Sequence, residues 1–485
     1  MSATDEHLRP PESPADRRFL GQPRPLATLV SLEVWERFSF YGMLGILLLY
    51  LYYPAGRGGL GFDEATAAGV VGAYGGSVYL CTVAGAWLAD RVFGAERVLF
   101  GSAVVVMGGH LALALLPGVT GVAAGLSLVA LGAGGVKATA SALVGSLYAA
   151  DDGRRDAGFS LFYLGINLGG LTGALLTGLL QKESGFRWGF GLAAAGMAIG
   201  LIGYARGRRR FTGAARAVTG SLTALLLGAA TVALIIVVLA RTGVIAAGRL
   251  SAIVVTLSIL AAVTYFAVIL SSPRVGRAER RRVLAFLPLF VASAAFCALY
   301  QQQFTVVTIY SDRRLDRTVF GWEMPVSWVL VLNPIFVVLL AGLFAALWTR
   351  LGPRQPSTPV KFALGTITMG VAFLLFLPFA GVGPGGVPLL AVAGIMLVFT
   401  VAELLIQPVG LAASTRLAPA AFRSQMVALF FLSVALGTAT SGLLARYYSE
   451  RHEVAYFGSL GLLAVALGGL LWAASPWIRR LSDVR

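Results

Sequence analysis

Long runs of apolar residues recur along the whole 485-residue chain, with short polar segments between them. Each run has about 20 residues or more, enough for a helix to cross a hydrocarbon core of roughly 30 Å. The runs lack the alternation of a β-strand, so helices must satisfy the backbone inside the bilayer. Fourteen membrane helices are therefore predicted, at residues 26–53, 64–89, 97–117, 119–149, 156–181, 186–206, 216–241, 247–272, 281–310, 325–350, 360–379, 385–416, 422–447 and 455–479.

Two basic runs divide these helices into groups of six, two and six. The first run is RGRRRF at 206–211, and the second is RVGRAERRR at 274–282. This layout predicts an all-α polytopic membrane protein with the major facilitator fold, in which two six-helix bundles are joined by two inserted helices. The predicted parts are a disordered cytoplasmic tail (1–25), an N-terminal bundle (26–206), an inserted pair with basic linkers (207–280), a C-terminal bundle (281–479) and a second cytoplasmic tail (480–485).

Composition and charge agree with a membrane location. The chain is 57% hydrophobic and 12% charged, whereas ordinary soluble domains are about 25% charged. Most of its Lys and Arg residues fall on the side of the membrane that holds the amino terminus, which predicts that both termini are cytoplasmic. The net charge of +16 is thus read as a topology signal and an attraction to membrane lipid, not as a sign of nucleic-acid binding.

The numbers of lysine and cysteine residues bear on the source organism and on disulfide formation. Lysine occurs 3 times against 35 arginines, an imbalance typical of GC-rich bacterial genomes, so a bacterial inner membrane is expected. The two cysteines, Cys81 and Cys297, lie in apolar segments and indicate no disulfide framework.

Five ionisable residues interrupt the apolar segments: Glu33, Glu36, Arg37, Lys137 and Glu403. Each would cost about 2.5 to 3.5 kcal/mol at the bilayer centre, so such residues face a bundle interior or a water-filled cavity. The spacing of the first three gathers their head groups on one helix face, with Tyr41 on the same stripe. The alternative interpretation is a self-neutralising cluster that extends toward the membrane surface.

Lys137 and Glu403 are isolated charges in the two halves of the chain, and the simplest arrangement pairs them. Polar residues Asn167, Asn333 and Gln301–Gln303 add to a predicted polar cavity. Two poles of opposite sign suit a zwitterion such as a peptide, and the same carboxylates are candidate proton carriers.

Several motifs resemble those of the proton-dependent oligopeptide transporter (POT/PTR) family of the major facilitator superfamily. They are ExxERF at 33–38 followed by Tyr41-Gly42, GAWLADRVFG at 85–94, FSLFYLGINLGG at 159–170, LNPIF around Asn333 and AELLIQPVG around Glu403. The resemblance covers nearly the whole chain. It implies a secondary active transporter in the cell membrane that imports di- and tripeptides by proton symport and alternating access. It also implies a functional monomer with no cofactor or metal and with protons as the coupling ion.

The resemblance also implies roles for individual residues. Arg37, Tyr41 and Lys137 would bind the peptide carboxylate, whereas Asn167, Asn333 and Glu403 would hold its amino terminus and backbone. The remaining pocket residues would be Tyr79, Gln301 and Phe430. Proton coupling would involve Glu33, Glu36, Arg37, Lys137 and Glu403.

The chain departs from the family pattern at five positions, and two of them, Cys297 and Phe430, stand where pocket tryptophans are common in the family. Phe40 stands where the motif has Tyr, and Leu44 and Gln301 stand where many members have an ion pair that closes the outer side. Loss of both partners of a buried pair is nearly neutral, whereas loss of one leaves an unpaired charge. We therefore expect the outer gate to close by packing and by hydrogen bonds from Gln side chains.

Other functions were weighed against this interpretation. The main alternative keeps the fold but transports another small zwitterion, a peptide-like compound or a drug, with weak or absent proton coupling. An enzyme is not predicted, because no HExxH or GxSxG arrangement supplies a metal site or a nucleophile. A channel is disfavoured because nothing resembles a selectivity filter.

Overall fold

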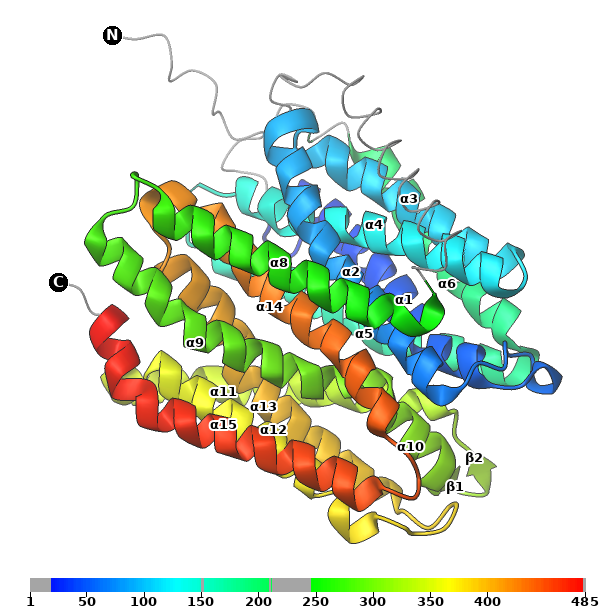
Figure 1. The fold of residues 1–485 in the computed structure, drawn as a ribbon. Helices are drawn as coiled ribbons and strands as arrows, with labels where there is room; N and C mark the ends of the chain where they lie inside the picture. Colours follow the sequence, from blue (N-terminus) through cyan, green and yellow to red (C-terminus); the bar gives the residue numbers. More distant parts are fainter. Residues whose placement is uncertain (1–18, 150–151, 209–210, 212–245, 483–485) are drawn as a thin grey trace. The chain divides into compact units, whose positions relative to one another are not determined.

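The computed structural model describes residues 19–149, 152–208, 211 and 246–482 (Figure 1). Helices dominate these ranges, and two short strands, β1 (Thr318–Val319) and β2 (Trp322–Glu323), form an antiparallel hairpin. The α-helices are α1 Arg24–Tyr52, α2 Glu64–Leu88, α3 Ala95–Leu115, α4 Gly118–Ser146, α5 Arg155–Ser184, α6 Phe186–Gly207, α8 Leu250–Ser271, α9 Arg277–Tyr300, α10 Val306–Arg314, α11 Leu332–Leu351, α12 Thr358–Leu374, α13 Leu389–Arg416, α14 Arg423–Leu444 and α15 Glu453–Ser482.

The prediction of an all-helical membrane protein is confirmed. Within the described ranges, 13 helical segments are long and apolar enough to cross a membrane, and their ends lie within four residues of the predicted spans. The predicted seventh helix, 216–241, lies outside the described residues. So do residues 1–18 of the predicted N-terminal tail and the last three residues of the chain.

The segment predicted as one helix at 281–310 is interrupted. It consists of α9, a 3₁₀ turn at Gln301–Phe304 and α10. Thr305 adopts φ −127° and ψ −96°, outside the helical region, and the Thr308 hydroxyl donates a 2.7 Å hydrogen bond to the Gln303 carbonyl. A side-chain hydroxyl that bonds the backbone competes with the regular helix ladder, which explains how the chain bends here without losing a backbone partner.

Contacts between Cα atoms divide the chain into two compact units. Unit 1 comprises Met1–Ile46 and Cys81–Leu239, and unit 2 comprises Leu47–Leu80 and Ala240–Arg485. Both units thus contain parts of α1 and α2: the division falls between Ile46 and Leu47 in α1 and between Leu80 and Cys81 in α2, and the hairpin between the two helices belongs to unit 2. The predicted domain boundaries follow the sequence alone and stay a prediction.

Close helix packing in unit 1 depends on glycines of α5. A Cβ atom on Gly169 would lie 2.2 Å from the Val34 carbonyl oxygen and 2.9 Å from the Arg37 Cβ, and one on Gly173 would lie 2.2 Å from the Phe38 carbonyl oxygen. Small residues allow helix backbones to approach closely in membranes. Glycine at these positions therefore holds the charged stretch of α1 directly against α5.

In unit 2, the inserted helix α8 lies along α14 (Figure 1). Its buried residues form one stripe, which consists of Ser251, Val254, Ser258, Ala262 and Ile269. The Ser251 hydroxyl donates a 2.6 Å hydrogen bond to the Gly69 carbonyl of α2. The opposite faces expose large apolar side chains, as a helix in contact with lipid requires.

Candidate functional site

Arg37 lies between two carboxylates on α1. Its Nε atom donates a 2.9 Å hydrogen bond to Glu33 Oε1 and lies 2.8 Å from Glu36 Oε2. All three residues are buried, with exposed fractions of 4% for Glu33, 0% for Glu36 and 3% for Arg37. The carboxylate oxygens of Glu36 accept no hydrogen bond among the described residues. The sequence prediction that these head groups gather on one helix face is confirmed by these distances.

Lys137 joins this group through the ring of Phe40. The Lys137 Nζ atom lies 5.4 Å from the centroid of that ring, and the Arg37 Cζ atom lies 5.5 Å from it. Both distances are within the roughly 6 Å range of cation–π attraction. The phenylalanine that departs from the family motif thus supplies an aromatic face to both Arg37 and Lys137.

The position of Lys137 follows from the glycines around it on α4. A Cβ atom on Gly134 would lie 2.5 Å from the Cys81 backbone, and a Cβ atom on Gly85 would lie 2.7 Å from the Gly135 Cα. The last turns of α2 and the middle of α4 are therefore in backbone contact. This contact fixes the part of α4 that carries the lysine.

Two further predicted residues of unit 1 lie on the α1–α5 contact. The ring of Tyr41 packs edge-on against Phe40 at 5.3 Å and covers Gly170 of α5. Asn167 lies one turn earlier on α5, and its amide donates a 2.9 Å hydrogen bond to the Tyr163 carbonyl. Tyr41 therefore directly adjoins the charged group, and Asn167 is tied to its own helix.

In unit 2, Glu403 is held by neutral groups. The Asn333 amide nitrogen donates to Glu403 Oε2 at 2.9 Å and to the Thr400 hydroxyl at 3.1 Å. The Tyr300 hydroxyl donates to Asn333 Oδ1 at 3.3 Å and also interacts with the Glu403 carboxylate. The structure thus joins Asn333 and Glu403, as the predicted amino-terminus site requires.

The other predicted residues of unit 2 contact α14. Gln301 donates a 3.0 Å hydrogen bond to the Thr438 hydroxyl. The rings of Phe430 and Phe431 lie 5.8 Å apart, and Phe431 stacks on Tyr79 at 6.3 Å. These contacts place aromatic rings and an amide beside α14, and the expected role of Tyr79, Gln301 and Phe430 in a peptide pocket stays a prediction.

A polar cluster that the sequence reasoning missed lies where α1 ends. Tyr52 donates a hydrogen bond to Asp312 Oδ2, and Tyr53 donates one to Oδ1 at 2.8 Å. The neighbouring Arg313 forms a 2.8 Å ion pair with Glu64, the first residue of α2. These contacts attach the α1–α2 hairpin to α10. The available signal was the acidic Asp312 next to a row of arginines, but its tyrosine partners are about 260 residues away in sequence.

Unit 1 therefore holds Glu33, Glu36, Arg37, Tyr41, Lys137 and Asn167, and unit 2 holds Tyr79, Gln301, Asn333, Glu403 and Phe430. The predicted pair of Lys137 and Glu403 joins residues of different units and stays a prediction. Sequence reasoning also missed Tyr300 and Thr400. Thr400 precedes Glu403 by one helical turn, a spacing that could have identified it.

No group of three or more His, Cys, Asp or Glu side chains suited to a metal ion occurs in the ranges that the structure describes. The site chemistry available there is charge and hydrogen bonding. It can bind a small polar molecule and exchange protons.

Comparisons with known proteins agree on one family for this chain. A sequence model of the POT family (PTR2) matches residues 96–463. The chain is 40% identical over 477 residues to the uncharacterized transporter YclF of Bacillus subtilis (strain 168), with 97% of each chain covered. It is 37% identical over 491 residues to a di-/tripeptide transporter of Lactococcus lactis subsp. cremoris, with 97% of this chain and 99% of that one covered.

Solved structures agree with these relatives. A crystal structure of a peptide transporter POT in complex with sulfate superimposes with a TM-score of 0.91 at 40% identity, covering 96% of this chain and 97% of that one. The fold and the family thus rest on matches along nearly the full length.

Proposed function

Since the chain belongs to the POT family of peptide transporters, we propose that it imports di- and tripeptides together with protons by alternating access. The family and the relatives are transporters, so the chain is a transporter and not an enzyme. The observation that carries the proposal is the buried group of Glu33, Glu36 and Arg37 with Lys137 beside the same Phe40 ring. Ionisable residues inside membrane segments are costly, and where they occur they mark substrate pathways and proton relays.

The peptide carboxylate is proposed to bind Arg37 and Lys137. The guanidinium of Arg37 and the ammonium of Lys137 share one aromatic neighbour, Phe40, and hydrogen bonds between ionised groups are about twice as strong as neutral ones. Tyr41 adjoins Phe40 and would add a hydroxyl donor. Phe40 itself offers no hydroxyl, so its role is to keep water away from the two cations.

The peptide amino group is proposed to bind Glu403. This carboxylate accepts a 2.9 Å hydrogen bond from Asn333, which fixes its orientation without neutralising its charge. Its described partners in unit 2, Asn333 and Tyr300, are neutral, so neither of them would compete with a peptide ammonium group for Glu403. Tyr79, Gln301 and Phe430 would contact the peptide backbone and side chains, together with Asn167.

Proton coupling is proposed to follow from the charge balance of the unit 1 group. Two cations, Arg37 and Lys137, face two carboxylates, Glu33 and Glu36, so the fully ionised group is neutral. Protonating one carboxylate leaves a net positive charge, which strengthens the attraction for a peptide carboxylate. A proton and a peptide then bind cooperatively, and each raises the affinity for the other by the same factor. Glu403 is a further candidate for proton exchange.

Closure of the outer side is proposed to use the Asp312 cluster in place of the family ion pair. Leu44 and Gln301 are neutral, and Gln301 bonds Thr438. By contrast, Tyr52, Tyr53 and Glu64 of the α1–α2 hairpin bond Asp312 and Arg313 of α10. These hydrogen bonds and this ion pair connect the α1–α2 hairpin to α10. They would thus replace the ion pair that closes the outer side in relatives.

The finer aspects of location and partners complete the proposal. Both termini would be cytoplasmic in a bacterial inner membrane, because most basic loop residues lie on that side. The protein would act as a monomer surrounded by lipid and would need no cofactor.

Uptake into proteoliposomes tests this function. Labelled dialanine and trialanine should accumulate when an inward proton gradient is imposed, and an excess of unlabelled dipeptide should compete. Competition by dialanine without a response to the gradient would favour the alternative of a weakly coupled transporter. Absence of competition would instead indicate another small zwitterion or a drug as the cargo.

A further inference from the structure

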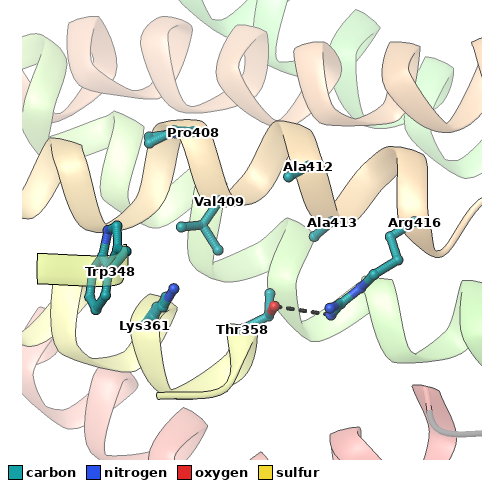
Figure 2. A pocket seen from close by; sticks show the side chains of 8 residues that line it. All are labelled: Trp348, Thr358, Lys361, Pro408, Val409, Ala412, Ala413 and Arg416. Atoms are coloured by element: carbon teal, nitrogen blue, oxygen red, sulfur yellow. Dashed lines mark hydrogen bonds between the residues drawn. The ribbon is translucent and has the colours of Figure 1, made fainter. Parts of the chain in front are cut away.

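A cavity of about 270 Å³ lies in unit 2, where α11 ends and α12 begins. Figure 2 shows Trp348 and Lys361 at one end and Arg416 at the other, with Thr358 between them. The remaining lining residues come from α13 and are Pro408, Val409, Ala412 and Ala413. None of these eight residues belongs to the proposed peptide site, so the cavity is a separate feature of unit 2.

The cavity contains two positive charges and no negative one. Lys361 is only 9% exposed. Its Nζ atom donates a 2.9 Å hydrogen bond to Gln355 and lies 3.9 Å from the centroid of the Trp348 ring. Arg416 donates a 3.1 Å hydrogen bond to the Thr358 hydroxyl. In the part of the chain that the structure describes, neither cation forms an ion pair with a carboxylate.

The start of α12 adds to this positive potential. The helix begins at Thr358, in the wall of the cavity. A helix amino terminus carries a partial positive charge and free backbone N–H groups, which favour a bound anion. A buried lysine, an arginine and a helix start therefore converge on one small cavity. Since like charges repel and a buried cation is costly, an anion is the missing complement.

We propose that this cavity binds the phosphate group of an anionic membrane lipid. Its volume falls just below the roughly 300 to 1,000 Å³ of pockets for drug-sized ligands, which suits a head group. An arginine fork and a lysine are the side chains that proteins use to hold phosphate oxygens. A guanidinium group at the rim and an ammonium group further inside would contact the phosphate from two directions.

An apolar path leads from the cavity along α11. The exposed residues Leu339, Leu343 and Leu347 are spaced by four, so they form one stripe on the helix. The stripe ends beside Trp348, and tryptophan prefers the level of lipid head groups in a membrane. Acyl chains would therefore lie along the leucine stripe while the phosphate occupies the cavity.

The surrounding charge agrees with a lipid of the cytoplasmic leaflet. Arg350 lies in the last turn of α11, Arg354 ends the short turn that follows, and Arg423 begins α14. The positive-inside rule places such loops in the cytoplasm. Basic pockets between membrane helices on that side are suited to anionic head groups.

Thermal unfolding of the purified protein in a neutral detergent tests the proposal. Short-chain phosphatidylglycerol, phosphatidylcholine and inorganic phosphate are added separately at equal concentration, without peptide. We expect phosphatidylglycerol to raise the unfolding temperature by about 3 °C or more, and the other two additives to raise it less. The double variant Lys361→Gln/Arg416→Gln should lose this gain. The control Arg479→Gln/Arg480→Gln removes two exposed charges from the last turn of α15 and should keep it.

Three results would overturn the assignment. An equal gain with phosphatidylcholine would show that the phosphate site does not select anionic lipid. An equal gain with inorganic phosphate that disappears in the Lys361 and Arg416 variants would assign the site to a soluble anion. A full gain with phosphatidylglycerol in those variants would exclude the cavity. If the double variant does not elute as the parent protein does in size-exclusion chromatography, each single variant should show a reduced gain.

Discussion

The hydroxyl of Tyr53 donates a 2.8 Å hydrogen bond to Oδ1 of Asp312, a residue about 260 positions further along the chain. Tyr52 donates to the other carboxylate oxygen, so both oxygens of Asp312 have a tyrosine partner. The aspartate side chain is 6% exposed. Removing its donors therefore leaves a buried negative charge with fewer hydrogen bonds, which is a costly change.

Tyr53→Phe should lower the free energy of unfolding by about 1 to 3 kcal/mol, because Asp312 loses one donor. Burial raises the pKa of Tyr53 above its usual value, and the negative charge of Asp312 raises it further. A raised pKa keeps the hydroxyl neutral, so its contribution is complete below the unfolded-state value of about 10 and is lost only at higher pH. The destabilisation should thus be equal at pH 6 and pH 9. Tyr447→Phe, on an exposed side chain of α14's C-terminal turn, is the control and should have no effect.

Arg37→Gln should destabilise the protein by about 3 to 5 kcal/mol, since it leaves Glu33 and Glu36 buried without their cation. Adding Glu33→Gln and Glu36→Gln should restore much of the stability, because the uncompensated charges are then gone. Transport should stay absent in both variants. Thermal unfolding and dipeptide uptake provide the two measurements. A triple variant no more stable than Arg37→Gln would contradict the charge-balance argument.

Glu36→Gln should uncouple uptake from the proton gradient. The variant cannot change charge at this position, so peptide binding should persist in a filter-binding assay while gradient-driven accumulation falls at least about tenfold. The matched control is Glu183→Gln, on the exposed end of α5, which should accumulate peptide like the parent. Undiminished acceleration by an inward gradient in Glu36→Gln would assign coupling to another carboxyl, with Glu33 and Glu403 as the next candidates.

Glu403→Gln should weaken the binding of peptides with a free amino terminus by about 10- to 100-fold, the range expected from loss of a 1.5 to 3 kcal/mol hydrogen bond to a charged group. N-acetylated peptides lack the ammonium group, so their weaker binding should change little. Competition assays with matched free and acetylated dipeptides give the comparison. Equal competition by both peptides in the parent protein would refute the proposed contact with the amino group.

Gly169→Ala should destabilise unit 1, because the new Cβ would lie 2.2 Å from the Val34 carbonyl oxygen and force α5 away from α1. The control is Gly191→Ala on α6, where a Cβ meets no atom within 4 Å. That change should stabilise the helix by about 0.4 to 1 kcal/mol. Unfolding temperatures of the two variants should therefore move in opposite directions. An unchanged or higher unfolding temperature in Gly169→Ala would mean that α5 can move without cost.

Much of the candidate site could be predicted from the sequence because charge is so expensive in a membrane. Glu33, Glu36, Arg37 and Lys137 stand out in apolar segments, and helical spacing alone places the first three together. Phe40 shows the limit of this reasoning. The sequence presents it as a lost hydroxyl, whereas the structure places its ring beside both Arg37 and Lys137.

Contacts between distant segments could not be predicted in the same way. The sequence gives no local reason for Tyr53 to meet Asp312 or for Asn333 to orient Glu403, since each contact depends on which helices become neighbours. The 3₁₀ turn at Gln301–Phe304 also escaped prediction, because the run is uniformly compatible with a helix. At the bend, the hydroxyl of Thr308 donates a hydrogen bond to the Gln303 carbonyl, which gives that carbonyl a partner outside the regular helix pattern.

The sequence by itself determined that this chain is a helical membrane protein with charged groups reserved for function. The physical reason is twofold. Bilayer thickness fixes the length of each apolar run, and the apolar core of the bilayer makes a charged side chain within such a run costly. The tertiary structure alone decided which partners these groups have: Lys137 and Arg37 beside one ring, Asp312 with two tyrosines, and Lys361 with Arg416 in one cavity. Such pairings arise from helix packing, which depends on glycine contacts and side-chain shapes across hundreds of residues and leaves no periodic signal in the sequence.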